Sequence, residues 1–394
     1  MVARALLHNC VSIDPETGIA PRGLLVEGGR IAATWPPDAA APDGAARIDL
    51  GGARLAPGLL DLHHHGDAVL RAPDDAPDAL RAASASMVRH GVTGFLPTTM
   101  AWPAPELAAR VERLAEALES GAWPGAIPIG LHLEGPWIRA EAAGAQPSSG
   151  IRPYDAAEAA SLLERGGVAI RMVTLAPELP RAGQLIDELA RRDIAIALGH
   201  TLADGAAIDE AVRAGARHVT HLFNAMGGIH QRGPGVAGAL LAEDRLSCDV
   251  IADGAHVHPD WLRTAARAKG ERLLLITDQI GAPGAEGGGF GSGSIRSDGS
   301  AWRLPDGRLA GSHLALDDAI DNVVRWRVMT LLDAVAACTL RPARLLGIEA
   351  ERGTLRVGAR ADLVAFDDSG AVLATWVEGR LAHGALRGDR LERR

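Results

Sequence analysis

Imidazole and carboxylate side chains stand at the ends of several short apolar segments of this chain. The six that matter most are His63, His65, Glu134, His200, His221 and Asp278. Nitrogen and oxygen donors without a cysteine among them suit a divalent ion such as Zn, Fe(II), Mn or Co. Metal-assisted hydrolysis also needs a carboxylate that accepts a proton from water and later passes it on. The six residues therefore predict a metal-dependent hydrolase in which Asp278 is the acid and base.

Glu134 occupies the least ordinary position of the six. It closes the mostly apolar stretch 126–134 and precedes a Gly-Pro turn, so a buried strand gives way to a loop at this carboxylate. A glutamate rarely stays buried unless it is paired or bound to a metal. One carboxylate at a strand end is weak evidence of function, but scattered solvated residues do not explain six such positions.

A run of three histidines follows the short apolar strand 59–62. Residues i and i+2 of a strand face the same side, so His63 and His65 are expected to point together and His64 away. Two imidazoles on one face are a good start for a metal site. The alternative is a fortuitous histidine run on a surface loop, and this motif alone does not decide between the two.

Short apolar strands alternate with helical segments through the middle of the chain. The later strands are expected at 91–98, 170–175, 195–198, 218–220, 248–252 and 273–278. Beyond them, a hairpin with an Asp306–Gly307 turn is expected at 302–310, and helices are expected at 316–325 and 331–337. The alternation of strands with helices is typical of a parallel sheet, and metal-ligand residues at the strand ends indicate a closed barrel with its site at the carboxyl-terminal rim. The predicted fold class is α/β, with a metal-dependent (β/α)8 TIM barrel.

Both ends of the chain have a different character from the middle. Residues 1–57 and 350–394 contain short β-like runs separated by Gly and Pro turns, without a helical period. We expect these two segments to form one small β-sandwich domain. The TIM-barrel catalytic domain is then expected to span residues 58–349.

Composition narrows the possible partners. The formal net charge is -9, and the absence of long Lys/Arg runs makes nucleic acid or an acidic membrane an improbable partner. A small phosphorylated substrate is still compatible, because one or two well-placed Arg or His residues suffice to bind it. The three cysteines are far apart, and neither a signal peptide nor a membrane-spanning apolar stretch is recognisable. These features predict a cytoplasmic enzyme.

Several longer motifs, taken together, resemble one known family. They include Pro57–Gly66, Leu131–Pro136, Gly199–Thr201, Thr220–Met226, Arg232–Gly235, Ile251–Val257, Thr277–Asp278 and Leu309–Ser312. In this order they resemble the N-acetylglucosamine-6-phosphate deacetylase family of the amidohydrolase superfamily. The stretches HLEGP and THLFNAM are the most specific, and the match extends over nearly the whole chain.

The resemblance implies a role for each metal-site residue. Glu134, His200 and His221 would hold the main ion, and His63 and His65 would add a second position that only some members keep. One or two ions are therefore expected, with Zn as the first choice and Fe, Mn or Co as alternatives. Asp278 would take the proton of the attacking water and give it to the sugar nitrogen, so that acetate and the amine leave.

The resemblance also implies residues that bind the sugar. Arg232 and His256 match positions that meet the 6-phosphate, and the arginine is usually lent by a neighbouring subunit, which implies a homodimer. From the sequence alone, Arg232 could equally be a plain exposed arginine. Asn224 and Ala225 lie where the family touches the sugar.

Two departures from the family pattern affect the substrate pocket. Gln146 stands where a histidine commonly contacts the sugar; it can donate a hydrogen bond but carries no charge. The run after Asp278, residues 279–284, is bulkier than the usual small residues. His313 follows in a region near the acetyl pocket, and its role is left open.

Three hypotheses follow, in order of preference. The first is a metal-dependent deacetylase of N-acetylglucosamine 6-phosphate. The second keeps the fold and metal but acts on another N-acyl amino sugar or small amide, as the departure at Gln146 would allow. The third is a non-catalytic sugar-phosphate sensor, against which the complete set of metal ligands and Asp278 argues, because a binding protein needs no hydrolytic carboxylate.

Overall fold

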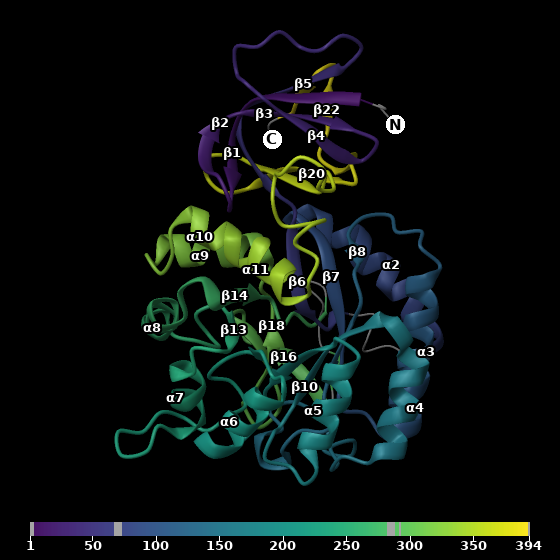
Figure 1. Ribbon diagram of the computed structural model, residues 1–394, viewed down its shortest axis with the longest axis vertical. Helices are drawn as coiled ribbons and strands as arrows, with labels where there is room; N and C mark the ends of the chain where they lie inside the picture. Colours follow the sequence, from purple (N-terminus) through teal and green to yellow (C-terminus); the bar gives the residue numbers. More distant parts are fainter. Residues whose placement is uncertain (1–3, 67–72, 282–287, 291–292, 393–394) are drawn as a thin grey trace.

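Eight parallel strands form the central barrel of the computed structural model, which describes residues 4–66, 73–281, 288–290 and 293–392 (Figure 1). In spatial order, the strands are β14 (Leu273–Ile276), β13 (Ser247–Ile251), β12 (His218–Val219), β11 (Ala195–Leu198), β10 (Ile170–Leu175), β9 (Leu131–Glu134), β7 (Val92–Thr99) and β6 (Leu59–His64). A short strand, β8 (Ile127–Pro128), pairs with β7. The predicted α/β barrel is confirmed.

The barrel closes between its last and first strands, next to the predicted site. The backbone N–H of Asp278, two residues after β14, donates to the carbonyl of His63 at 2.9 Å. The N–H groups of His65 and Gly66 both donate to the carbonyl of Gln279 at 3.0 Å. These bonds fix Asp278 beside the histidine pair although more than 200 residues separate them in sequence.

Helices cover the outside of the barrel (Figure 1). They are α2 (Ala76–Met87), α3 (Ala104–Glu119), α4 (Ala156–Gly166), α5 (Ala182–Arg191), α6 (Gly205–Ala214), α7 (Gly235–Ala242), α8 (Pro259–Lys269), α9 (Leu316–Arg325), α10 (Leu331–Ala337) and α11 (Leu340–Leu345). Most bury one apolar face; α5, for example, buries Ala182, Leu185, Ile186 and Leu189. No helix in the described part of the chain has the length and apolarity needed to cross a bilayer.

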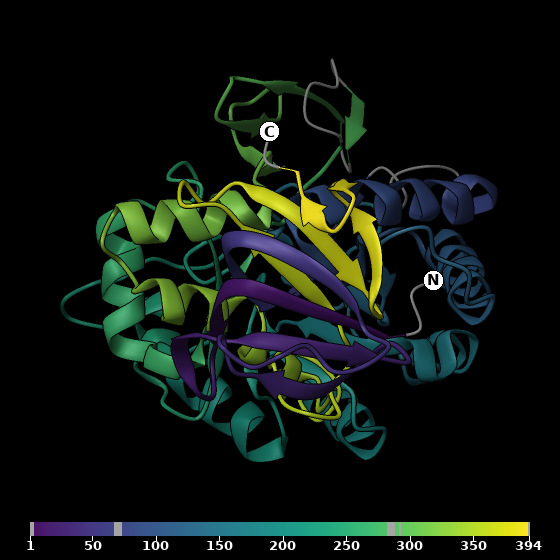
Figure 2. The same ribbon diagram turned by 90° about the horizontal axis from the view of Figure 1, so that it is seen from above.

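Strands from both ends of the chain make up the small domain (Figure 2). The N-terminal ones are β1 (Arg4–Asp14), β2 (Gly18–Pro21), β3 (Gly23–Glu27), β4 (Arg30–Trp35) and β5 (Ala46–Pro57). The C-terminal ones are β19 (Leu363–Phe366), β20 (Val372–Val377), β21 (Arg380–His383), β22 (Leu386–Arg387) and β23 (Arg390–Leu391). Antiparallel pairing of β19 with β5 joins the two ends into one ten-stranded sheet with its own apolar core.

A third, four-stranded sheet is inserted between β14 and α9. It contains β15 (Gly288–Phe290), β16 (Gly293–Ser297), β17 (Ala301–Arg303) and β18 (Leu309–Ser312). The hairpin predicted around Asp306 and Gly307 is confirmed as the β17–β18 pair. Buried Trp302 ties this sheet to the barrel by donating its Nε1–H to the carbonyl of Ile280 at 2.9 Å.

A buried ion pair lies where the small domain meets the barrel. Arg352 donates to Asp362, and both side chains are almost fully buried. The second carboxylate oxygen of Asp362 accepts from the N–H of Glu378 at 2.7 Å, and its carbonyl accepts from the N–H of Gly58 at 2.7 Å. Burial raises the pKa of Asp362, and the charge of Arg352 offsets part of that rise. The pair therefore fastens the start of β19 to the start of the barrel.

We predict that Arg352→Leu lowers the free energy of unfolding by about 3–5 kcal/mol, because it leaves the Asp362 carboxylate buried without a counter-charge. Urea unfolding followed by circular dichroism measures the change. The matched control is Arg356→Leu, which removes an arginine whose ion pair with Glu16 is partly exposed, and it should cost less than about 1 kcal/mol. Equal losses in the two variants would contradict this account.

Candidate active site

The predicted metal-site residues come together at the carboxyl-terminal ends of the barrel strands. His63 lies in β6, Glu134 ends β9, and His200, His221 and Asp278 each stand two residues beyond β11, β12 and β14. The last three adopt left-handed backbone conformations, with φ of 48°, 34° and 48°. Such conformations are costly for residues other than glycine and tend to persist only where surrounding contacts enforce them.

Two buried aspartates provide contacts of that kind. Asp249 accepts from the backbone N–H of His221 with one oxygen, and its other oxygen lies 2.8 Å from Nε2 of His218. On the opposite side of the site, Asp61 accepts from the N–H of His63 at 3.3 Å and from the hydroxyl of Thr277 at 2.6 Å. Both aspartates therefore brace the backbone that carries the site residues.

The Glu134 carboxylate lies at the centre of the four histidines. Its Oε1 is 2.9 Å from Nε2 of His200 and 2.9 Å from Nε2 of His221. Its Oε2 is 3.2 Å from Nε2 of His65 and 3.5 Å from Nε2 of His63. The two oxygens therefore serve two separate pairs of imidazoles.

Two overlapping groups of three donors result, and both include Glu134. One contains His63 and His65, the other His200 and His221, and within each group the donor atoms lie within 4.8 Å of one another. Nδ1 of His65 lies 3.0 Å from the carbonyl of Thr98, and Nδ1 of His200 lies 2.9 Å from that of Ala142. These carbonyls accept only if Nδ1 carries the proton, which leaves a lone pair on Nε2 facing the carboxylate. Such lone pairs repel the nearby carboxylate oxygens unless a metal ion, or in its absence a proton on Nε2, lies between them, so the donors fit a divalent metal.

Asp278 is the second carboxylate of the site. Its Oδ1 lies 3.3 Å from Nε2 of His65 and 3.5 Å from Nε2 of His63. Burial by itself would raise the pKa of Asp278, but the charges and hydrogen bonds of these two histidines lower it to about 2. Burial likewise opposes charge on His65, yet hydrogen bonds to Asp278 and Glu134 raise its pKa to about 10. The two carboxylates thus draw positive charge into the site.

A hollow of about 220 Å³ opens above these groups. Among the residues proposed from the sequence, its lining includes His65, Glu134, Gln146, His200, His221, Asn224, Ala225, His256 and Asp278. His256 is nearly buried and pairs through Nδ1 with Asp253 at 2.6 Å. The hollow brings together potential metal ligands, a proton acceptor and several polar groups, which is the composition of a hydrolytic site.

Gln146 has a defined place in this hollow. Its Oε1 accepts from the backbone N–H of Ala101 at 2.8 Å, and its Nε2 donates to Oε2 of Glu134 at 2.5 Å. The amide is therefore anchored at one end and orients the central carboxylate at the other. Gly144, two residues earlier, has a φ of 58° and lies against the ring of His200, where a side chain would be strained.

Two of the predicted substrate residues do not line the hollow of their own chain. Arg232 lies on an exposed segment between β12 and α7. His313 packs against Trp302 with the rings tilted by 41° and their centroids 4.4 Å apart, and its Nε2 is 2.8 Å from the hydroxyl of Ser297. Part of the altered run after Asp278, residues 282–284, lies outside the described residues.

Arg308 lines the hollow and was not singled out from the sequence. It stands just before β18, donates to the carbonyl of Gly144 at 2.5 Å, and pairs with Asp306 at 2.7 Å. It is thus an arginine placed at the rim of the pocket. The Asp306–Gly307 turn predicted the hairpin, but the contact with Gly144 spans 164 residues, and no local pattern marks it.

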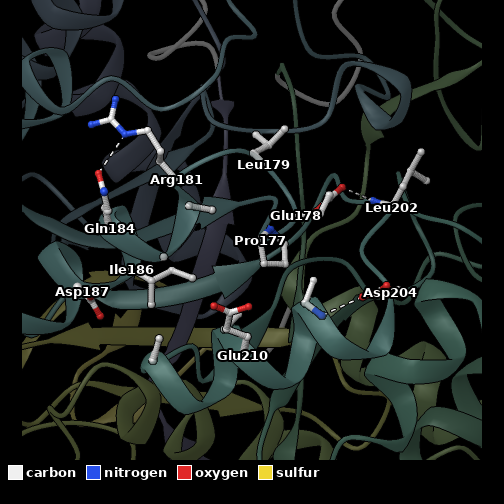
Figure 3. A pocket seen from close by; sticks show the side chains of 15 residues that line it. Pro177, Glu178, Leu179, Arg181, Gln184, Ile186, Asp187, Leu202, Asp204 and Glu210 are labelled. Carbon is white, nitrogen blue, oxygen red and sulfur yellow. Dashed lines mark hydrogen bonds between the residues drawn. The ribbon is translucent and has the colours of Figure 1, made fainter.

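A larger hollow, of about 750 Å³, lies between α5 and α6 and does not contain the metal-site residues (Figure 3). Two of its carboxylates bind neighbouring backbone or hydroxyl groups. Glu178 accepts from the hydroxyl of Thr201 and the N–H of Leu202, and Asp204 accepts from the N–H of Ala207 at the start of α6. Size alone therefore does not identify the reactive site of this chain.

Comparison with known proteins gives the same result as the geometry. The model of the amidohydrolase family matches residues 54–382. A human N-acetylglucosamine-6-phosphate deacetylase is 39% identical over 349 residues, which cover 85% of each chain. An N-acetylgalactosamine-6-phosphate deacetylase of Escherichia coli O157:H7 is 36% identical over 330 residues, covering 83% of this chain and 87% of that protein.

Solved structures agree in fold over 96% of this chain. A crystal structure of N-acetylglucosamine-6-phosphate deacetylase from Pasteurella multocida superposes with a TM-score of 0.89 at 28% identity, covering 96% of this chain and 99% of that one. The corresponding enzyme from Mycobacterium smegmatis gives a TM-score of 0.85 at 31% identity, with the same coverage. The chain therefore belongs to the N-acetylglucosamine-6-phosphate deacetylase family of the amidohydrolase superfamily.

Proposed function

We propose that this protein hydrolyses N-acetylglucosamine 6-phosphate to glucosamine 6-phosphate and acetate in amino-sugar catabolism. The observation that carries the proposal is the position of the Asp278 carboxylate, 3.3 Å from one potential metal ligand, at the open end of a buried Glu-His cluster. A cluster that only stabilised the barrel would need no second carboxylate there. The names of the relatives supply the substrate class.

Two divalent ions are proposed, with Zn as the first choice and Fe, Mn or Co as alternatives. The supporting observation is that the two carboxylate oxygens of Glu134 face different histidines. Its Oε1 lies close to His200 and His221, and its Oε2 lies close to His63 and His65. When bound, such ions polarise a carbonyl oxygen and lower the pKa of water.

Asp278 transfers the proton in the proposed reaction. It is a carboxylate that faces the hollow beside the metal donors, so it can accept a proton from the attacking water. The same carboxyl then donates that proton to the sugar nitrogen as the C–N bond breaks, which releases a neutral amine. The Oδ1 of Asp278 lies 3.3 Å from Nε2 of His65 and 3.5 Å from Nε2 of His63, so the acceptor oxygen stands beside the donors that would hold the second ion.

Sugar binding is proposed to involve the rest of the hollow and a second subunit. Gln146, Asn224, Ala225 and His256 already line the pocket. Arg232, on its exposed segment, is proposed to reach the 6-phosphate in a neighbouring subunit, which makes the enzyme a homodimer. His313 is proposed to act nearby through its contact with Ser297.

The three cysteines are free and buried, which supports a reducing, cytoplasmic location.

A second candidate substrate is N-acetylgalactosamine 6-phosphate. It is favoured by the relative from Escherichia coli O157:H7, whose name gives that sugar. The two sugars differ only in the orientation of one hydroxyl, so the same metal site and Asp278 would serve both. Amine release from each sugar, measured side by side, decides between them by the ratio of kcat/KM.

We predict that Asp278→Asn lowers kcat for N-acetylglucosamine 6-phosphate by about 100- to 10,000-fold, because the amide cannot accept the proton. Amine release measures the rate, and elemental analysis of the same sample verifies that metal is retained. Gln279→Ala, which alters the next residue, serves as the matched control and should keep most of the activity. Near-normal turnover by Asp278→Asn would contradict the proposed role of Asp278 in proton transfer.

We predict that wild-type protein carries two divalent ions per chain and that the double variant His63→Asn/His65→Asn carries one. Glu134→Gln should lose both, because both donor groups include this carboxylate. Inductively coupled plasma mass spectrometry gives the stoichiometry. His64→Asn is the control, because His64 packs on Phe95 on the other side of β6. Two ions remaining in His63→Asn/His65→Asn would rule out the second position.

We predict that Arg232→Gln raises KM for N-acetylglucosamine 6-phosphate at least tenfold. The much slower reaction of unphosphorylated N-acetylglucosamine should stay unchanged, because only the phosphorylated sugar presents a dianion to the guanidinium. Arg213→Gln is a control at another exposed arginine. An equal effect on both sugars would argue against phosphate recognition by Arg232.

A further inference from the structure

A hollow of about 690 Å³ lies at the opposite end of the barrel from the metal site. It is lined by Arg217 just before β12, by Ser247 at the start of β13 and by Leu274 in β14, and the ends of α8 and α11 complete it. Parallel strands start at this end, whereas the metal ligands stand where the strands finish. The hollow is therefore separate from the site described above.

Positive charge dominates this hollow, although the whole chain carries a formal charge of -9. Seven of its lining residues are Lys or Arg, and Glu271 is its single acidic one. Some of these cations already have partners: Arg245 pairs with Glu243 and Asp209, and Lys269 donates to the carbonyls of Glu243 and Leu246.

Three of the arginines have no such partner. Arg267, Arg272 and Arg344 are exposed in the hollow, and within the described part of the chain none of them forms an ion pair. A fourth, Arg217, has only a 3.5 Å contact with the exposed Asp193. Several guanidinium groups thus share one hollow with a single carboxylate, that of Glu271, and this surplus of positive charge favours an anionic ligand.

Arg341 shows that the hollow is built into the fold. Its side chain is 6% exposed, and it donates to the carbonyls of Gly270 and Leu273 at 3.2 and 2.9 Å and to Asp333 at 3.2 Å. Its Nε is shielded from solvent and has no hydrogen-bond partner among the described residues. A buried donor without an acceptor is costly, and the positive charge of this fixed guanidinium adds to the attraction of the hollow for an anion.

We propose that this hollow binds a small, multiply charged anion bearing phosphate groups. Guanidinium forks match phosphate oxygens in pairs, and the volume falls in the range of small-molecule sites. A long polyanion fits less well, because the rest of this acidic chain would repel it. Arg267 in α8 and Arg344 in α11 are the side chains expected to bind the ligand, each from a different helix.

Isothermal titration calorimetry of the metal-loaded protein with inorganic pyrophosphate tests the proposal. The double variant Arg267→Gln/Arg344→Gln should bind pyrophosphate at least tenfold more weakly than wild type, while its deacetylase activity stays unchanged. Arg191→Gln/Arg192→Gln removes the same number of charges from the exposed end of α5 and should bind like wild type.

Each other result overturns the proposal. The same affinity in Arg267→Gln/Arg344→Gln and in wild type would place the observed binding elsewhere, such as at the metal ions. Equal weakening in both double variants would mean that pyrophosphate responds only to net charge. Absence of binding by wild type at millimolar pyrophosphate would mean that the hollow has no anion site.

Discussion

A carboxylate buried among imidazoles is the constraint on which the rest of the site depends. Glu134 is 2% exposed and ends a strand that lies deep in the barrel. A charge in this position is unstable unless positive charge surrounds it. Four histidines from three other strands or their ends approach it within 3.5 Å. The barrel brings four segments that are distant in sequence, those of Glu134 and of the four histidines, to one place.

Bringing those segments together requires unfavourable local geometry. His200, His221 and Asp278 have positive φ, and so do Phe223 and Ala225 in the loop that follows β12. Each such residue costs about 1–3 kcal/mol, which contacts elsewhere must offset. Asp249 and Asp61, both fully buried, supply part of the compensation: Asp249 accepts from the N–H of His221, and Asp61 accepts from the N–H and the hydroxyl of Thr277, which precedes Asp278. Part of the backbone strain of this chain therefore lies where the side chains of the site converge.

Much of this arrangement could be predicted from the sequence, because its signals are local. Strand alternation placed His63 and His65 on one face, and their Nε2 atoms lie 3.2 Å apart. Apolar runs ending in polar residues predicted the barrel, and the helices at Leu316–Arg325 and Leu331–Ala337 begin and end where expected. The joining of both chain ends into one small domain followed from their shared β character.

What the sequence did not disclose depends on distant contacts. Asp249 and Asp61 are ordinary polar residues within apolar runs, and only the folded barrel shows what they hold. Arg308 reaches the pocket through a hairpin whose turn was recognisable but whose direction was not. The basic hollow collects arginines from four separate segments, each too sparse to form a charged run. In all three cases the residue types are visible in the sequence but their neighbours are not.

Gln146 makes the two halves of the donor cluster unequal. Its Nε2 donates to Oε2 of Glu134, the oxygen that also faces His63 and His65, whereas Oε1 meets only His200 and His221. A hydrogen bond of 2.5 Å withdraws electron density from Oε2, so that oxygen is the poorer metal donor. A neutral amide cannot relinquish this proton at any ordinary pH, unlike an imidazolium. The His200–His221 side is therefore expected to hold its ion more tightly, and the His63–His65 side depends more on its two imidazoles than on the shared carboxylate.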